Sequence, residues 1–477
     1  MAILIARTRP YGFGGVPDLN SSTKTFLNSL LYYSTTLFKV KDIALAPEGE
    51  LLIVWAQDHM PVLGLIRKEF EKTKPLVGMR IGACLHATKE TAVLVRTLEA
   101  GGAKVILCGS NPLSTHDSVV AALASTGTEV FAWREQTNEE YYDCVKSVLR
   151  LKPNYTMDDG ADLVNTLHTD KEFNTDGVKA GSEETTTGVI RLRAMHKDGA
   201  LKYPIVAVND TPTKHMFDNR YGTGQSTIDG ILRATSVLLA GKTVVVCGYG
   251  WCGKGIASRA RGMGAIVYVV EVNPICALEA VMDGFMVTSI EDASAFGDLF
   301  ITATGNKNII DRNHLLSMKD GAILANSGHF NAEINISALE ELSISKRTMR
   351  PNLVEYTLSG QHHHFKLYLL GEGRLVNLVA AEGHPSEVMD MSFADQALVA
   401  EWVWSSYTSK KRVENMGIPI DEKTNKTDKW REIKVYDVPS DIDKKVATLK
   451  LKSMGICLSS LTKEQEEYSN SWKAGTA

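Results

Sequence analysis

An apolar strand, a glycine-rich turn, a helix and a second apolar strand follow one another between residues 242 and 273, and no other stretch constrains the fold as strongly. Residues 243–247 and 265–270 are short, β-branched runs, which is typical of buried strands. The glycines after the first run have the spacing G-x-G-x-x-G: Gly248, Gly250 and Gly253. This order predicts a βαβ unit of a doubly wound parallel sheet.

Each of these glycines occupies a position that a side chain would obstruct. We expect Gly248 to form the tight turn, Gly250 to let the backbone approach a pyrophosphate, and Gly253 to let the helix pack on the strand. The phosphates would lie at the helix N-terminus, where free N–H groups favour negative charge. Glu271 follows after about 20 residues, where a carboxylate accepts both ribose hydroxyls of NAD and repels the extra phosphate of NADP. The stretch predicts NAD binding; the alternative is a βαβ unit that only packs.

Composition excludes several other classes of function. The 477 residues suffice for two or three domains, and a net charge of -4 provides no electrostatic footprint for nucleic acid or an acidic membrane surface. No apolar run approaches the roughly 20 residues that span a bilayer. The seven cysteines are scattered without the spacing of metal ligands: Cys84, Cys108, Cys144, Cys247, Cys252, Cys276 and Cys457. We therefore expect a reduced, cytoplasmic protein with no metal site and no nucleic-acid or membrane partner.

Strand and helix patterns alternate from residue 40 onwards, with strands expected at 79–85, 103–108 and 129–133. This first doubly wound region has no glycine fingerprint, so we expect it to bind the substrate. The expected fold class is α/β, with two doubly wound, Rossmann-like domains, an interdomain cleft and a small C-terminal helical tail. The expected boundaries are a leader of residues 1–38, a substrate-binding domain of residues 39–220 to which residues 386–440 return, an NAD-binding domain of residues 221–385 and a tail of residues 441–477.

The leader contains Arg7, Arg9 and Lys24, several serines and threonines, and a single acid, Asp18. This composition fits either an organelle transit peptide or a disordered segment. We favour the disordered segment.

A dense polar tract lies between the two α/β regions. It contains Asp158-Asp159-Gly160, residues 182–188, Asn209-Asp210, Lys214 and Asp218-Asn219. Polar loops between domains are usually solvated linkers, but this tract carries acids, a lysine and amides without a solvating run of charge. Because interdomain clefts are preferred ligand sites, we interpret the tract as part of an active site.

Two later strands, expected at 298–304 and 322–326, are each followed by glycine. Ligands of doubly wound sheets lie at the carboxyl ends of strands, so residues 304–305 and 326–329 are expected near a nicotinamide. Three consecutive histidines at 362–364 suggest a metal patch at first sight. Neighbouring residues of a strand point to opposite faces, so they cannot converge on one ion, and we expect them at the surface.

Several motifs, in order along both regions, resemble those of the S-adenosylhomocysteine hydrolase family. They are CLHATKETA (84–92), EETTTG (183–188), Asn209-Asp210, Lys214, Phe217-Asp218-Asn219, the glycine loop, Gly328-His329-Phe330 and Gly383-His384-Pro385. The resemblance extends from about Val40 to near the C-terminus. It implies a homotetramer that holds NAD tightly and reversibly hydrolyses S-adenosyl-L-homocysteine to adenosine and L-homocysteine.

The residue types in the polar tract suit that chemistry. Water attacks a thioether carbon poorly, because an alkyl thiolate leaves badly from an unactivated centre. Oxidation of the ribose 3′-hydroxyl to a ketone acidifies the C4′ proton, so a base can remove it and expel homocysteine. Water then adds, and the retained hydride returns to the ketone. The scheme needs a hydride acceptor, an acceptor for the hydroxyl proton and a second base for carbon.

The resemblance implies a role for each polar residue of the tract. Lys214 and Asp218 contact the ribose hydroxyls, with Lys214 as the proton acceptor. Asp159 is the C4′ base, and Glu184 orients the ribose. Taken singly, each could equally be a cap or a solvated group. Their ordered set is what indicates an active site.

Further residues are assigned by the same resemblance. His86 and His329 flank the 5′ carbon, where the leaving thiolate and the entering water need protons. Thr88 and Glu90 recognise the base, together with the backbone around His384. The implied NAD-binding residues are Thr185, Thr186, Thr187, Asn219, Gly248, Gly250, Trp251, Cys252, Gly253, Lys254, Gly255, Glu271, Cys276, Thr304, Asn326, Ser327, Gly328, His329, Asn377 and His384.

The sequence departs from the family pattern at several positions. Where many members have Tyr-Gly-Cys-Arg-Glu-Ser, residues 221–226 read Tyr-Gly-Thr-Gly-Gln-Ser, so Thr223 and Gln225 replace a cysteine and a glutamate. Cys276 replaces an asparagine, and the tail lacks the Lys- and Tyr-bearing pattern that reaches a neighbouring NAD. These features resemble the archaeal, thermophile-like branch and bear on cofactor affinity.

The base that the enzyme accepts stays open at this stage. Some members of that branch prefer S-inosylhomocysteine, whose hypoxanthine offers a carbonyl where adenine offers an amine. One acceptor-to-donor change near Glu90 could switch the preference. Two further alternatives are a simple NAD-dependent dehydrogenase, which would release NADH, and a non-catalytic regulatory relative. The complete set of polar residues argues against the latter.

Overall fold

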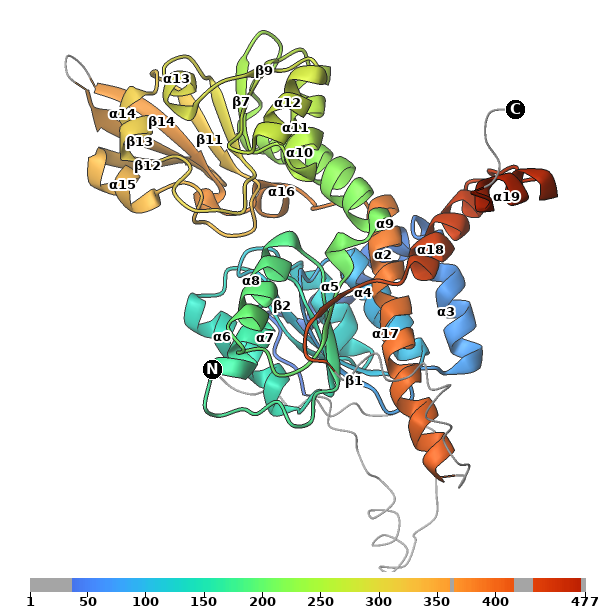
Figure 1. Cartoon of the computed structure of the whole chain (residues 1–477). Coiled ribbons are helices and arrows are strands. Elements are labelled where there is room, and N and C mark those ends of the chain that lie inside the picture. The colour runs from blue at the N-terminus through green and yellow to red at the C-terminus, as the bar shows by residue number, and fades with distance from the viewer. Residues whose placement is uncertain (1–36, 361–363, 416–431, 473–477) are drawn as a thin grey trace, which may run out of the picture.

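The computed structural model describes residues 37–360, 364–415 and 432–472. Nearly all of the predicted leader, two of the histidines at 362–364 and the segment 416–431 lie outside these residues. The described chain forms two bodies, each built on one sheet (Figure 1). No described helix is both long enough and apolar enough to span a membrane.

The first body contains a seven-stranded sheet in the order β15-β6-β5-β4-β1-β2-β3, and each pair of neighbouring strands is parallel. Its strands are β1 (Arg80–Leu85), β2 (Lys104–Gly109), β3 (Glu129–Phe131), β4 (Tyr155–Asp158), β5 (Ala180–Glu183), β6 (Ile205–Ala207) and β15 (Val435–Asp437). In the interior strand β1, Cys84 lies opposite both Cys108 and Asp158. The continuous apolar runs of β1 and β2 suit strands that are covered on both faces.

Helices cover this sheet and join its strands. They are α2 (Ala46–Asp58), α3 (Pro61–Thr73), α4 (Lys89–Ala100), α5 (Asp117–Ser125), α6 (Asn138–Arg150), α7 (Asp162–Thr169) and α8 (Thr186–Lys197). Local sequence signals set several of their ends. The hydroxyl of Thr137 accepts a hydrogen bond from the N–H of Glu140, and the carboxylate of Glu140 accepts one from the N–H of Thr137, so that a capping box starts α6. Proline at the first or second position starts α2 and α3.

The second body contains an eight-stranded sheet in the order β12-β13-β14-β11-β10-β7-β8-β9. Its strands are β7 (Thr243–Cys247), β8 (Ile266–Val270), β9 (Met286–Val287), β10 (Leu299–Thr302), β11 (Ala322–Asn326), β12 (Ser343–Arg350), β13 (Leu353–Ser359) and β14 (His364–Leu370). The strands from β14 to β9 are parallel, whereas β12, β13 and β14 form an antiparallel extension. The predicted βαβ unit is β7, α11 (Trp251–Gly262) and β8.

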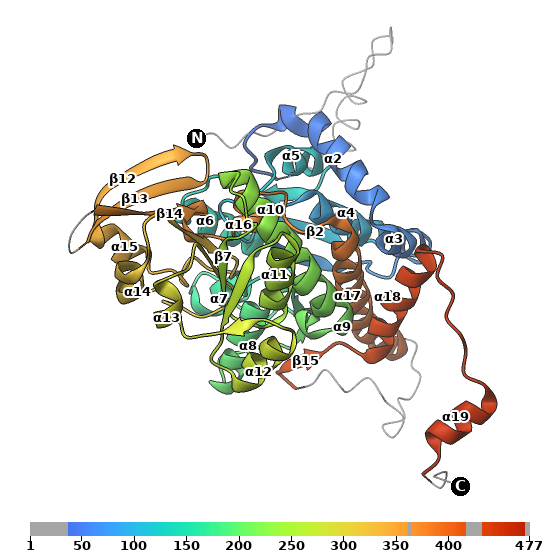
Figure 2. The same cartoon turned by 90° about the horizontal axis from the view of Figure 1, so that it is seen from above.

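The remaining helices of the second body surround this sheet (Figure 2). They are α12 (Pro274–Met282), α13 (Ile290–Ser294), α14 (Arg312–Ser317), α15 (Ile336–Leu342) and α16 (Val376–Val379). A continuous helical path enters this body from the first. It consists of α9 (Pro212–Lys214), a π-helical segment labelled η3 (His215–Gly222) and α10 (Thr223–Thr235).

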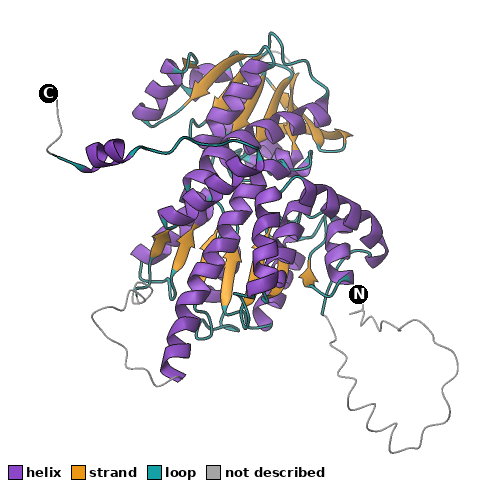
Figure 3. Ribbon diagram, turned by 90° about the vertical axis from the view of Figure 1, so that its right-hand side faces the viewer, coloured by secondary structure: helices purple, strands orange, loops and turns teal. Residues whose placement is uncertain are grey.

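The chain then returns to the first body through α17 (Ser386–Asn415). Phe393, Ala397 and Leu398 of this helix are buried in the first body's core, and β15 pairs with β6. Helix α18 (Ser440–Ser453) packs against α3 and α17 and buries Val446. The described residues after 453 are all exposed, and α19 (Lys463–Asn470) projects away from the body (Figure 3). The predicted fold class, including a helical tail, is therefore confirmed.

The position between the two α/β regions that was expected for the polar tract holds only for its last part, since Lys214, Asp218 and Asn219 lie in α9 and η3 on the path between the bodies. The earlier part belongs to the first sheet, as the expected bounds of the substrate-binding domain imply, because it starts at the end of β4 and includes β6 and the end of β5. These strands have only three or four residues each, too few to give a clear apolar pattern in the sequence. The acids of the tract follow directly after the strands, so the tract's place at a ligand-binding edge comes from the sheet itself.

Candidate functional site

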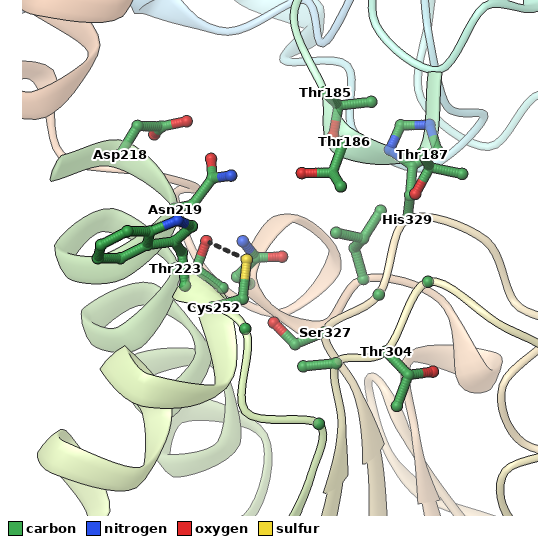
Figure 4. A pocket seen from close by; sticks show the side chains of 18 of the residues that line it. Thr185, Thr186, Thr187, Asp218, Asn219, Thr223, Cys252, Thr304, Ser327 and His329 are labelled. Carbon is green, nitrogen blue, oxygen red and sulfur yellow. Dashed lines mark hydrogen bonds between the residues drawn. The ribbon is translucent and has the colours of Figure 1, made fainter. Parts of the chain in front are cut away.

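A cavity of about 580 Å³ lies where the carboxyl ends of the parallel strands of the two sheets face each other. Residues after β1, β4 and β5 line it from the first body, and residues after β7, β8, β10 and β11 line it from the second. Figure 4 shows Asp218, Asn219, Thr223 and Cys252 along one side of this pocket, with Thr185 across from them. This edge of a parallel sheet is where doubly wound proteins bind ligands.

The glycine-rich turn forms an open cradle at the start of α11. Gly248 has a φ of +101°, and a Cβ there would lie 2.7 Å from the carbonyl oxygen of Ala303. A Cβ at Gly253 would lie 1.9 Å from the carbonyl oxygen of Gly248, so helix and strand touch through backbone. By contrast, a Cβ at Gly250 would have no atom within 4 Å. Gly250, the N-cap of α11, therefore faces open space where a phosphate group fits.

Glu271 closes the far end of this cradle. Its Oε2 accepts a hydrogen bond of 2.7 Å from the N–H of Tyr249, and its Oε1 accepts bonds of 2.7 and 2.9 Å from the N–H groups of Val272 and Asn273. These bonds fix the carboxylate at the end of β8. The cavity is also lined by Cys276, which follows at the start of α12.

Lys214 lies in a buried cluster of acids on the opposite side of the cavity. Its Nζ lies 2.9 Å from Asp218 Oδ2 and 3.8 Å from Glu184 Oε1, and it donates a 2.7 Å bond to Asn219 Oδ1. Burial alone would lower the pKa of Lys214, but the carboxylates of Asp218 and Glu184 outweigh burial and raise it. Lys214 is therefore an ammonium ion at neutral pH in this arrangement.

Asp218 joins this cluster to a histidine from the segment before α17. Burial would raise the pKa of Asp218, but His384 and Lys214 hold it well below its ordinary value. Because the carboxylate can only accept, Nδ1 of His384 donates to Asp218. His384 Nε2 then faces Asn377 Nδ2 at 3.1 Å and Thr223 Oγ1 at 3.3 Å. Thr223 in turn lies 3.6 Å from Cys252 Sγ, as the dashed line in Figure 4 shows.

A second acid, Asp159, lies between two histidines. Its carboxylate is 3.6 Å from Nε2 of His86 and 4.0 Å from Nδ1 of His329. Burial lowers the pKa of His86 to about 4 and also lowers the pKa of His329. Both imidazoles are therefore neutral at pH 7. His86 is oriented through Nδ1, which lies 2.8 Å from the hydroxyl of Ser114.

Glu90 occupies another part of the cavity wall, in the first turn of α4. Ser386 donates a 2.6 Å hydrogen bond to Glu90 Oε1, and the ammonium of Lys89 lies 3.4 Å from the same oxygen. Both of these contacts use Oε1, which leaves Oε2 to meet a ligand. Thr88, the N-cap residue of α4, lines the cavity beside it.

Most of the residues predicted from the sequence line this one cavity. They are His86, Thr88, Glu90, Asp159, Glu184, Thr185, Thr186, Thr187, Lys214, Asp218, Asn219, Gly248, Gly250, Trp251, Cys252, Glu271, Cys276, Thr304, Ser327, Gly328, His329, Asn377 and His384. Thr223, one of the departures, also lines it, whereas Gln225 is exposed elsewhere.

Four of the predicted residues do not line the cavity. Gly253 and Gly255 pack against backbone, since a Cβ at Gly255 would lie 1.8 Å from the carbonyl oxygen of Arg220. Lys254 forms a 2.6 Å ion pair with Glu279. Asn326 is fully buried, and its Nδ2 lies 3.1, 2.9 and 2.8 Å from the carbonyl oxygens of Gly328, Phe330 and Gly373, which fixes the loop after β11.

Sequence reasoning missed two sets of residues at this site. Glu333 accepts hydrogen bonds from the N–H groups of Thr304 and Gly305 and so shapes the loop after β10. Ser392 and Gln396 of α17 both donate to Glu184. Neither set has a local sequence signal, because each acts on residues far away along the chain.

Comparisons with known proteins point to one family. The sequence model described as S-adenosyl-L-homocysteine hydrolase matches residues 37–180, and its NAD binding domain model matches residues 219–383. An adenosylhomocysteinase of Sulfurisphaera tokodaii is 56% identical over 443 residues, covering 92% of this chain and 100% of that protein. An adenosylhomocysteinase of Aquifex aeolicus is 56% identical and an S-inosyl-L-homocysteine hydrolase of Methanocaldococcus jannaschii is 53% identical, each over 92% of this chain and 100% of its own length.

Proposed function

The chain belongs to the S-adenosyl-L-homocysteine hydrolase family, whose members are NAD-binding enzymes, and from this premise we propose the reaction and the role of each residue. The reaction is the reversible hydrolysis of S-adenosyl-L-homocysteine to adenosine and L-homocysteine. One observation carries the proposal: the acids and the lysine of the first body and the glycine cradle of the second body open into the same cavity.

The residues of the second body fit NAD. The open space at Gly250 admits a pyrophosphate at the start of α11, and Glu271 presents a carboxylate where the two hydroxyls of the adenine ribose would lie. The same carboxylate would repel the 2′-phosphate of NADP. When bound, NAD supplies a hydride acceptor for the ribose 3′ carbon and later returns the hydride.

Lys214 and Asp218 are proposed to hold the ribose hydroxyls, with Lys214 accepting the 3′-hydroxyl proton. Their charges set a condition on this role. Because Asp218 and Glu184 raise the pKa of Lys214, the ammonium must lose its own proton before it can accept another. Glu184 offers a remaining lone pair on each oxygen to orient the ribose.

Asp159 is proposed to remove the C4′ proton, which is acidic while the 3′ carbon is a ketone. His86 and His329 flank this acid and are neutral, and a neutral imidazole can either donate or accept a proton. We assign them to the 5′ position, where homocysteine leaves and water enters. Both histidines have a ring nitrogen within 4.0 Å of the Asp159 carboxylate, which supports this assignment. The departure of homocysteine and the entry of water both follow the removal of the C4′ proton by that carboxylate.

Glu90 is proposed to select adenine over hypoxanthine. A carboxylate only accepts hydrogen bonds, so Oε2 suits the exocyclic amine of adenine and would repel the carbonyl of hypoxanthine. Hypoxanthine is the alternative base to test, because one relative, from M. jannaschii, is an S-inosyl-L-homocysteine hydrolase.

The test is to incubate purified protein with homocysteine and either adenosine or inosine and to measure the thioether product. We expect S-adenosyl-L-homocysteine from adenosine, little product from inosine, and no stoichiometric NADH in solution. Faster turnover with inosine would reverse the base assignment. Stoichiometric release of NADH would indicate a simple dehydrogenase, and absence of product with either base would indicate a regulatory relative.

A homotetramer in the cytoplasm is proposed as the working form. Exposed apolar side chains support association: Ile275, Leu278 and Met282 on α12 are 76%, 57% and 76% exposed. All seven cysteines are free thiols, which fits a reducing compartment.

A further inference from the structure

We propose that Gln396, on the helix that returns from the second body, is a positioning residue that keeps the Glu184 carboxylate ionised and fixed beside Lys214. The inference rests on the proposed function, because it concerns the ribose-orienting acid of that site. It adds a residue that touches no substrate and sets the pH range in which this acid works.

The hydrogen-bond network fixes the orientation of the Gln396 side chain. Gln396 is fully buried, and its Nε2 lies 2.6 Å from Glu184 Oε2. Its Oε1 accepts a 2.7 Å hydrogen bond from the hydroxyl of Ser182. An ionised carboxylate can only accept, so the amide must present nitrogen to Glu184 and oxygen to Ser182. A rotated amide would place two oxygens against each other.

Glu184 needs this donor because burial works against its charge. Burial raises the pKa of Glu184 to about 7, against the lowering effect of Lys214, whose Nζ is 3.8 Å away. Asp218 and Asp159 are the other charged groups that raise the pKa, and Asp395 faces it from α17. Donors to the carboxylate oxygens are what remain to favour the ionised form.

Ser392 and Gln396 supply these donors from two positions four residues apart on one face of α17. Ser392 donates to Oε1 and Gln396 donates to Oε2, so each oxygen retains a lone pair for a ribose hydroxyl. Glu184 itself follows β5, and 212 residues separate it from Gln396. The return of the chain to the first body therefore completes the ribose site.

The test is the pH profile of kcat/KM for hydrolysis of S-adenosyl-L-homocysteine, because this quantity reports ionisations of the free enzyme. Gln396→Met keeps the volume and removes the donor. We expect the acidic limb to move upward by about one pH unit, which is roughly a tenfold loss on that limb, with an alkaline plateau close to that of wild type. Gln136→Met is a matched control, because Gln136 is another buried glutamine and bonds Cys144 outside the cavity.

The outcomes separate positioning from a merely structural role. A uniform loss at every pH, or an unmoved acidic limb, would overturn the proposal. If Gln396→Met does not fold, Gln396→Asn retains an amide that is too short to reach Glu184, and its acidic limb must move in the same direction. Wild-type turnover tests the proposed function by itself, so an inactive wild type and an unmoved limb in the variant are distinct failures.

Discussion

At the scale of single residues, the site is organised by two groups of three titratable side chains. Lys214 with Asp218 and Glu184 forms one group, and Asp159 between His86 and His329 forms the other. Mutual attraction holds Lys214 and Asp218 ionised, whereas burial raises the pKa of Glu184 and keeps the two histidines of the second group neutral. The two groups can therefore handle protons differently at the same pH.

Substitution of Lys214 distinguishes a proton acceptor from a residue that supplies only a positive charge. Lys214→Arg keeps a positive charge beside Asp218 but cannot accept a proton at accessible pH. We expect both Lys214→Arg and Lys214→Ala to lose turnover by at least about a hundredfold while NAD stays bound. Steady-state rates and the NAD content of the purified variants check this. Turnover near the wild-type rate in Lys214→Arg would show that the lysine supplies charge only.

Glu90 carries a prediction about the base. In Glu90→Gln the side chain can donate a hydrogen bond, and a carbonyl of hypoxanthine becomes an acceptable partner. We expect the ratio of kcat/KM for adenosine over inosine to fall by about tenfold or more. Competition between the two nucleosides in one reaction measures this ratio directly. An unchanged ratio would place base recognition elsewhere in the cavity.

His86 predicts a pH dependence of stability. Its pKa of about 4 in the folded protein is below the ordinary value, so the unfolded chain binds a proton more readily. Stability that is present above the ordinary histidine pKa of about 6.5 is expected to decline as the pH falls towards 4. Melting temperatures of wild type and His86→Asn, compared across this window, should show a shallower decline in the variant. If the melting temperatures of the two proteins declined in parallel, His86 would not be the source of the pH dependence.

At the scale of elements, the turn between β7 and α11 separates the requirements of folding from those of binding. The carbonyl of Gly248 occupies the space that a Cβ at Gly253 would need. Gly250 faces open space, and its φ of -72° is one that alanine adopts freely. The same change at these two positions therefore has different consequences.

Gly253→Ala should lower the free energy of unfolding by about 1–3 kcal/mol or more, since its Cβ would meet backbone. Gly250→Ala should unfold like wild type without NAD but bind NAD at least about tenfold more weakly, because the methyl group occupies the cradle. Denaturant titration of the NAD-free proteins and calorimetric titration with NAD measure the two effects. Wild-type NAD affinity in Gly250→Ala would place the pyrophosphate elsewhere.

At the scale of the whole molecule, the site exists only because the chain crosses between two bodies twice. It leaves the first body through α9, η3 and α10 and returns through α17. The first crossing carries Lys214 and Asp218, and the second carries Gln396. Apolar faces are still exposed in the single chain, notably on α12.

Association should cover such faces. Light scattering on the eluting protein is expected to give a mass close to four times the 52.2 kDa of the chain, and the value should not change on dilution to working concentration. A mass of one chain would contradict the proposed homotetramer.

The sequence by itself determined the fold class, the NAD cradle and the family. These features are local: the glycine spacing, the strand before it and the acid after it all lie within one βαβ unit, so backbone sterics fix them without help from the rest of the chain. Most candidate residues were named through the resemblance of their motifs to the family, and only residues 304–305 and 326–329 were placed from the carboxyl ends of expected strands.

Tertiary structure decided the rest. Pairing of β4, β5 and β6 placed the earlier part of the polar tract at the carboxyl edge of the first sheet, and only Lys214, Asp218 and Asn219 lie on the path between the two bodies. The tertiary structure also decided the charge of Lys214, the orientation of His384 by Asp218 and the hydrogen bonds that side chains of α17 donate to Glu184. Such properties depend on burial and on contacts between residues that are far apart along the chain, and neither is written in local spacing.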